Sequence, residues 1–139
     1  MFLFRRFSAE DSSRIQALRG LCRKFLSENN REARGLRLLR GWLSPEQRAQ
    51  FDAARYFDVI GCDSGKRYRI HYGTAANVYE LDDAGRPKVG RCFVPNVQLV
   101  AGDVMLAQKI ALETMESSAL AVANPFRPKV EPVEPRTPF

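Results

Sequence analysis

The stretch YFDVIGCDSGKRYRIHYG (residues 56–73) decides the fold, because here the apolar residues change from helical spacing to alternation. Two runs rich in aromatic and β-branched residues flank CDSGK (62–66), a sequence typical of turns. If Gly61 faces Lys66, the predicted pairs across this hairpin are Phe57 with Ile70, Asp58 with Arg69 and Val59 with Tyr68. That register puts apolar pairs on one face and a pair of opposite charges on the other.

The same turn has some features of a phosphate-binding loop. A Walker-type loop has four residues between its first glycine and its Gly-Lys pair, then Ser or Thr for magnesium, then a helix. Here three residues separate Gly61 from Gly65, Arg67 follows Lys66, and a strand pattern comes next. The sequence therefore predicts a β-hairpin and not a nucleotide site.

Further short runs of the same kind follow the hairpin. They are NVYEL (77–81) and PKVGRCFV (87–94), and DDAGR (82–86) between them is a turn sequence. We expect a four-stranded antiparallel meander over about residues 56–94.

The residues before the hairpin predict three helices. Apolar residues recur at helical spacing from Ile15 to Leu26, so a first helix is expected over about 9–27, with SENN (27–30) ending it. A second helix over about 30–43 has Trp42 and leucines on one side and arginines on the other. A third begins at Pro45 and lasts to about 55, because Ser44 can cap it and Gln47 completes a capping box.

The last third of the chain predicts one buried helix and an extended arm. Residues 102–124 have helical spacing and are apolar over most of their circumference, which is typical of a buried helix. Five of the eight prolines lie in residues 125–139 and favour a polyproline-like arm. The sequence thus predicts one α+β domain over 1–124, made of a basic helical part (1–55), the sheet (56–94) and the buried helix (102–124), followed by the arm (125–139).

Positive charge is concentrated near the start of the chain. Residues 1–50 contain 11 Lys and Arg against 5 Asp and Glu, whereas residues 51–139 contain 11 of each. Ten of the cations in residues 1–50 are arginines, whose planar guanidinium suits two-point contacts with phosphate or carboxylate. This asymmetry predicts an anionic partner, either nucleic acid or an acidic protein surface, although a solvated helix surface also has this composition.

The candidate contacts with nucleic acid come from the helices and from the second strand. The arginines of the second helix form a ridge that the first helix extends, and the strand RYRIH (67–71) alternates basic residues with apolar ones. A basic strand face beside tyrosines fits a nucleic-acid platform, and it equally fits a half-buried strand with a solvated face. The predicted nucleic-acid-binding residues are Arg19, Arg23, Lys24, Arg34, Arg37, Arg40, Arg67 and Arg69.

The chain offers little for catalysis or metal binding. His71 is the one histidine, and Cys22, Cys62 and Cys92 match no compact zinc spacing. His71 and Cys62 would act as base and nucleophile only if a further group oriented the ring. We therefore predict a non-enzymatic protein without metal or cofactor, in which Cys22 and Cys92 are small core residues.

The arm gives a second hypothesis, that of a structural or adaptor subunit in a larger protein assembly. Polyproline-like segments dock in grooves of partner proteins at low entropic cost. Residues 125–139 would then form a protein complex through four apolar anchors, Phe126, Val130, Val133 and Phe139. The start, MFLFRRF, has the wrong order for a signal peptide, so we expect a cytoplasmic protein that does not contact membranes.

Residues 50–124 also resemble a small family of bacterial proteins with no known activity. The similarity is carried by YFDV, a turn, YRI and NV, followed by the helix DVMLAQK (103–109) and a nearby AN. The resemblance implies a shared α+β module and transfers no functional residue.

Overall fold

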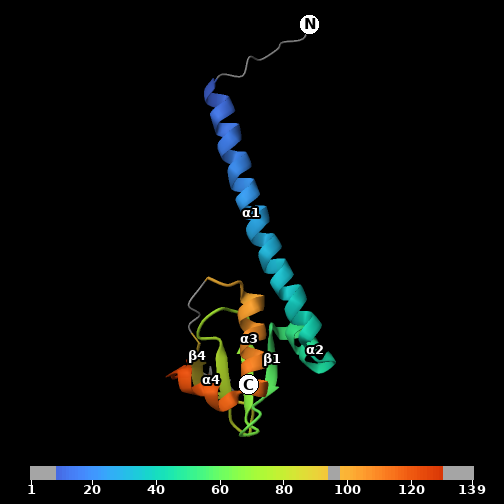
Figure 1. Ribbon diagram of the computed structural model, residues 1–139, viewed down its shortest axis with the longest axis vertical. Coiled ribbons are helices and arrows are strands. Elements are labelled where there is room, and N and C mark those ends of the chain that lie inside the picture. The colour runs from blue at the N-terminus through green and yellow to red at the C-terminus, as the bar shows by residue number, and fades with distance from the viewer. Residues whose placement is uncertain (1–8, 94–97, 130–139) are drawn as a thin grey trace, which may run out of the picture.

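A single long helix projects from a small body of strands and helices (Figure 1). The computed structural model describes residues 9–93 and 98–129. In chain order the elements are α1 (Ala9–Trp42), α2 (Pro45–Ala54), β1 (Tyr56–Ile60), β2 (Arg67–His71), β3 (Val78–Leu81), β4 (Pro87–Cys92), α3 (Ala101–Thr114), α4 (Glu116–Val122) and β5 (Asn124–Phe126). The α+β class is as the sequence predicts.

The five strands form one antiparallel sheet in the order β1-β2-β3-β4-β5. The predicted hairpin register is confirmed, with Phe57 opposite Ile70 and Val59 opposite Tyr68. The predicted turn at 82–86 is also present, since the Asp82 side chain accepts hydrogen bonds from the backbone of Ala84 and Arg86. These features depend on residues close together in the sequence.

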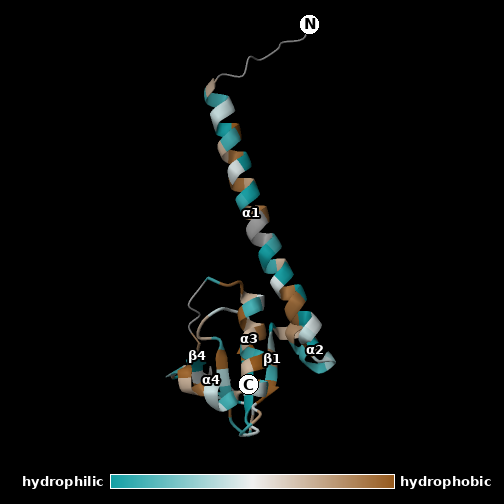
Figure 2. Cartoon of the chain, in the orientation of Figure 1, coloured by the Kyte–Doolittle hydropathy of each residue, from teal (hydrophilic) through white to brown (hydrophobic). Residues whose placement is uncertain are grey.

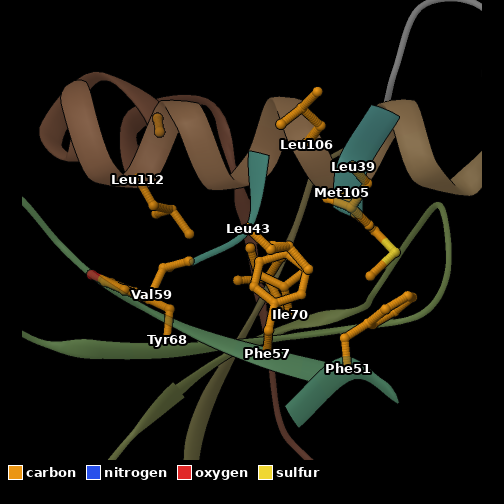
Figure 3. Close-up of a cluster of buried hydrophobic side chains, with 12 residues drawn as sticks. Leu39, Leu43, Phe51, Phe57, Val59, Tyr68, Ile70, Met105, Leu106 and Leu112 are labelled. Atoms are coloured by element: carbon orange, nitrogen blue, oxygen red, sulfur yellow. The ribbon is translucent and has the colours of Figure 1, made fainter. Parts of the chain in front are cut away.

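The core lies between one face of the sheet and helices α1, α2 and α3 (Figure 3). Leu39 comes from α1, Leu43 follows directly after this helix and Phe51 comes from α2, and they meet the inner residues of β1 and β2. Helix α3 supplies Met105, Leu106 and Leu112. Only the last two turns of α1 therefore take part in this core.

The prediction of two helices before Pro45 is wrong, because residues 9–42 form one helix of 34 residues. Asn and Ser cost only some tenths of a kcal/mol within a helix, and SENN contains neither proline nor glycine to stop it. The helix ends instead at Trp42, and Ser44 then caps α2 with the predicted capping box.

The C-terminal third differs from the prediction at two points. The helix expected over 102–124 is broken at Met115 into α3 and α4, since Met115 has φ −143° and ψ 46°. Asn124, predicted to end the helix, and residues 125–126, predicted to begin the arm, form the edge strand β5 on β4, so the sheet has five strands and not four. Pro125 fits there because an edge strand leaves one row of its backbone groups unpaired.

The position of α1 is set by a close contact between two glycines. A Cβ atom added to Gly102 of α3 would overlap the backbone carbonyl group of Gly35 in α1. A Cβ atom added to Gly35 would lie 2.7 Å from a methyl group of Val100. The two helix backbones thus cross in direct contact, which explains a glycine inside a helix where it costs up to about 1 kcal/mol relative to alanine.

This contact predicts opposite effects of two glycine substitutions. Gly102→Ala should lower the free energy of unfolding by roughly 1–3 kcal/mol, because the added methyl group meets backbone that cannot move aside. Gly41→Ala should raise it by up to about 1 kcal/mol, because no atom lies within 4 Å of the added Cβ. Urea denaturation followed by circular dichroism measures both, and a Gly102→Ala variant as stable as Gly41→Ala would rule out the tight crossing.

Candidate nucleic-acid interface

Four of the predicted arginines form a line along the exposed side of α1. Four, eleven and three residues separate Arg19, Arg23, Arg34 and Arg37, close to whole numbers of helical turns. All four are exposed, and within the described part of the chain no carboxylate forms an ion pair with any of them. We call these four residues the arginine ridge.

Two other predicted residues of α1 lie off this ridge. Lys24 is exposed but follows Arg23 directly, so it points about 100° away around the helix. Arg40 faces α2, where its guanidinium binds both carboxylate oxygens of Asp52, one of them at 3.1 Å. Arg48 donates in turn to the Arg40 carbonyl oxygen at 3.0 Å. The assignment of Arg40 to the ridge is therefore wrong, because its charge is matched and it holds α1 on α2.

The ridge passes beside three depressions in the surface. Arg34 lines all of them, and the largest, of about 920 Å³, lies between α1 and the segments that carry Tyr72, Thr74 and Gln98. A smaller one of about 400 Å³ brings Arg34 and Arg37 next to Leu38 and Trp42. Arg34 is thus the ridge residue that borders all three depressions.

Trp42 is a candidate that the sequence analysis assigned to the wrong face. Leu38 and Trp42 were expected on the apolar side of their helix, but they are 52% and 60% exposed. They lie on one side because four residues separate them, and that side adjoins Arg34 and Arg37. The spacing of four residues from Arg34 to Leu38 and from Leu38 to Trp42 already indicates this position within the predicted helix over 30–43.

The outer face of β2 carries less unmatched positive charge than predicted. Arg69 donates from Nε to Asp58 Oδ1 at 2.9 Å, and its guanidinium stacks 4.2 Å from the centre of the Tyr56 ring. The hydrogen bond with Asp58 raises the pKa of Arg69 above its ordinary value. Arg67 is exposed at the start of β2. The sheet therefore presents one of the two predicted arginines as an unmatched charge, within the described residues, and it does not extend the ridge.

The outer face of the sheet carries a row of four half-buried rings. The centre of the His71 ring lies 5.3 Å from those of Tyr56 and Tyr79, and the Tyr79 ring lies 5.5 Å from Phe126. Burial, and then the charge of Arg69, lower the pKa of His71. Phe126 is predicted to anchor the arm on a partner protein, but its ring covers Gly90 within the sheet. The other anchors, Val130, Val133 and Phe139, lie outside the described residues.

The turn that has features of a phosphate loop does bind an anion, and this anion is a side chain of the chain itself. The Glu116 carboxylate accepts hydrogen bonds from the backbone N–H groups of Asp63 and Ser64, at 3.0 and 2.7 Å, and from the hydroxyl groups of Ser64 and Tyr68. It is 1% exposed, and a Cβ atom added to Gly61 would overlap it. The turn thus has no room for a phosphate group.

A second carboxylate, which belongs to the turn itself, also ties the turn to α4. Asp63 accepts from the backbone N–H and the hydroxyl group of Ser117, at 3.0 and 2.7 Å, and so caps the first turn of α4. Those hydrogen bonds lower the pKa of Asp63. Glu116 and Asp63 together tie the β1–β2 turn to α4, which accounts for the break in the helix at Met115.

Neither the cysteines nor His71 form a site. Cys22 and Cys62 are exposed and Cys92 is half-buried, so the expectation that Cys22 lies in the core is wrong. Cys62 lies in the turn, whereas His71 lies opposite Tyr56 at the other end of the hairpin, so the two are not a catalytic pair. Among the described residues, no group of three His, Cys, Asp or Glu side chains is placed to hold a metal ion.

Comparisons of the chain with protein-family models, with curated proteins and with solved structures found no match. The resemblance of residues 50–124 to a bacterial family stays a prediction. No helix among the described residues has the length and apolar content needed to cross a membrane.

The buried Glu116 predicts a dependence of stability on pH. Burial alone would raise the pKa of Glu116, but the hydrogen bonds from Ser64, Tyr68 and Asp63 outweigh it, so the pKa lies below its ordinary value. The carboxylate therefore stabilises the fold above the unfolded pKa of about 4.3, and this stabilisation is lost as the pH falls below it. Glu116→Gln should lower the free energy of unfolding at neutral pH by about 2 kcal/mol, because an amide nitrogen cannot accept these bonds.

Urea titrations between neutral pH and about pH 3 test this expectation. Wild type should lose stability over the acid part of the range more steeply than Glu116→Gln, since the variant lacks the titrating group. Asp83→Asn is the control, because Asp83 is an exposed carboxylate in a turn. Equal slopes for wild type and Glu116→Gln would show that the carboxylate does not contribute in this way.

Proposed function

We propose that this chain is a non-enzymatic protein that binds nucleic acid through the arginine ridge of α1. The observation that carries the proposal is the line of four exposed guanidinium groups without carboxylate partners among the described residues. A carboxylate of the same chain could neutralise such a group in a surface ion pair, as Asp52 does for Arg40. The four ridge arginines have no such pair in the part of the chain that the structure describes. This row of unmatched cations runs from the projecting turns, at Arg19 and Arg23, to the crossing with α3, at Arg34 and Arg37, and all four are accessible to a long polyanion.

The dimensions of the ridge fit a phosphate backbone. Arg19 and Arg37 are eighteen residues apart, which is roughly 27 Å along a helix. Four phosphate contacts over this length would give a log–log slope of binding against salt of about −3 to −4 on duplex DNA, and less on a single strand. Arginine also binds phosphate by two parallel hydrogen bonds, which favours it over lysine at such a surface.

Trp42 favours a nucleic acid over other polyanions. Its ring is 60% exposed beside Arg34 and Arg37, so an unpaired base can stack on it while the arginines hold the flanking phosphates. Polyphosphate or an acidic protein surface would use the arginines but would gain little from the indole.

Fluorescence anisotropy with labelled oligonucleotides tests the proposal. The double variant Arg34→Glu, Arg37→Glu should weaken binding by at least about tenfold and lower the salt slope by about 2, because it removes two phosphate contacts. Trp42 is the one tryptophan of the chain, so binding of an unlabelled single strand should also quench the intrinsic fluorescence.

The control is a charge reversal of equal size on the sheet, Arg67→Glu with Lys88→Glu, because both side chains are exposed and lie on strands β2 and β4. Binding by net charge alone would weaken equally in both double variants, and that result would refute the ridge as the binding surface. Absence of any binding at low salt would refute the proposed function itself.

A further inference from the structure

The projecting half of α1 carries a stripe of large apolar side chains in contact with water. Leu18, Leu21, Phe25 and Leu26 are 60–66% exposed and Ile15 is 39% exposed, while Cys22 is also exposed. These six residues are called the apolar stripe below. Brown, hydrophobic segments recur along this free part of the helix (Figure 2). An apolar patch of this extent on a soluble chain marks an interaction surface.

The apolar stripe continues the buried face of the same helix. Ile15, Leu18, Cys22 and Phe25 have spacings of three and four residues, the a and d positions of a heptad repeat. The same repeat reaches Leu36, Leu39 and Leu43, and these pack in the core beside α3. One face of α1 is therefore covered by α3 and the sheet over its last turns and lacks a partner among the described residues over its first turns. A second helix can cover the first turns as α3 covers the last.

We propose that the apolar stripe pairs with the stripe of a second copy of the chain, the two α1 helices running antiparallel and centred on Gly20. In this arrangement Ile15 of one copy faces Phe25 of the other, and Leu18 faces Cys22. Leu21 meets its own counterpart at the edge of the seam. Each layer combines a larger side chain with a smaller one, so the stripe is complementary to itself.

The length of the free segment fits this symmetric arrangement. Pairing about Gly20 places residue 31 of one copy beside residue 9 of the other, so the paired helices end just before α1 meets α3 at Gly35. The two bodies then lie at opposite ends and do not collide. The six side chains of each copy bring together on the order of 1,000 Å² in total, the size that a specific interface needs.

Charge favours the antiparallel over the parallel direction. Glu32 follows Phe25 by one heptad, so in a parallel pair the two Glu32 side chains would face each other across the seam. In the antiparallel pair Glu32 lies beyond the paired segment. A parallel pair would also place both bodies at the same end.

The antiparallel pair also brings the two arginine ridges together at Arg19. Arg19 flanks the seam, and the two-fold symmetry brings it next to the Arg19 of the other copy on one side of the helix pair. Their repulsion weakens the dimer at low salt and is screened as salt rises. Dimer formation should therefore strengthen as the salt concentration rises, whereas nucleic-acid binding should weaken. The opposite salt dependences allow either proposal to be refuted without the other.

The oligomeric state of the full chain tests the pairing. Size-exclusion chromatography with light scattering should give a mass of twice 15.8 kDa. The variant Leu18→Gln, Phe25→Gln should give the monomer mass, with a dissociation constant raised at least about a hundredfold, because four large apolar side chains leave the seam. The fold should persist because both side chains are exposed within one chain.

The matched control is Ala17→Gln, Lys24→Gln, which shifts both substitutions by one residue and off the apolar stripe. It should remain a dimer. A monomeric wild type at high protein concentration would overturn the proposal. Binding of a monomeric chain to vesicles of phosphatidylglycerol and phosphatidylcholine would overturn it in favour of a lipid surface as the occupant.

Cross-linking tests the direction of the helices. With Cys62 and Cys92 replaced by serine, Leu18→Cys should form a disulfide-linked dimer with Cys22 of the other copy on a non-reducing gel. Cys22 alone should not, because the two Cys22 positions are offset by about 6 Å along the helices in addition to their lateral separation. A dimer linked through Cys22 alone would overturn the antiparallel arrangement.

Discussion

The backbone contact between Gly35 and Gly102 determines what the rest of α1 can do. It holds α1 against α3 near the C-terminal end of the longer helix, so that Leu36 and Leu39 of α1, and Leu43 directly after it, reach the core. Any larger residue at position 102 would push α1 away from the body. Because the crossing lies so far along the helix, the preceding turns project into solvent and display Arg19, Arg23 and the whole apolar stripe, while Arg34 and Arg37 lie beside the crossing.

A second constraint ties the sheet to the C-terminal helices through polar groups. Glu116 satisfies two backbone donors of the β1–β2 turn, while Asp63 of that turn caps α4. Glu116 belongs to α4 and binds the turn, whereas Asp63 belongs to the turn and caps α4. The position of each element therefore depends on the other. The Glu116 carboxylate also takes the position where a phosphate group would bind, so the anion-binding geometry of the turn is structural.

The features that the sequence predicts correctly depend on neighbouring residues, and the errors involve distant ones. Alternation and turn residues are enough to predict the hairpin register, and Ser44, Pro45 and Gln47 are enough to predict the start of α2. An apolar helical face can be buried or exposed with the same spacing, and Trp42 was accordingly misplaced. Strand β5 contains a proline and forms only because β4 offers it an edge. Alternation along β2 alone predicts an unmatched basic face, whereas the hairpin register places Asp58 opposite Arg69 and so matches its charge.

The ridge and the stripe lie on different sides of one helix, and this makes their occupation interdependent. Up to the crossing at Gly35, α1 has no packing partner among the described residues, and an unpacked helix of this length is only marginally stable in water. A second copy on the stripe would hold the helix and so fix the spacing of the guanidinium groups before a polyanion arrives. A polyanion on the ridge would in turn offset the repulsion between the two Arg19 side chains. Under the two proposals, thermodynamic linkage makes these effects equal: nucleic acid would strengthen the dimer by the factor by which dimerisation strengthens binding.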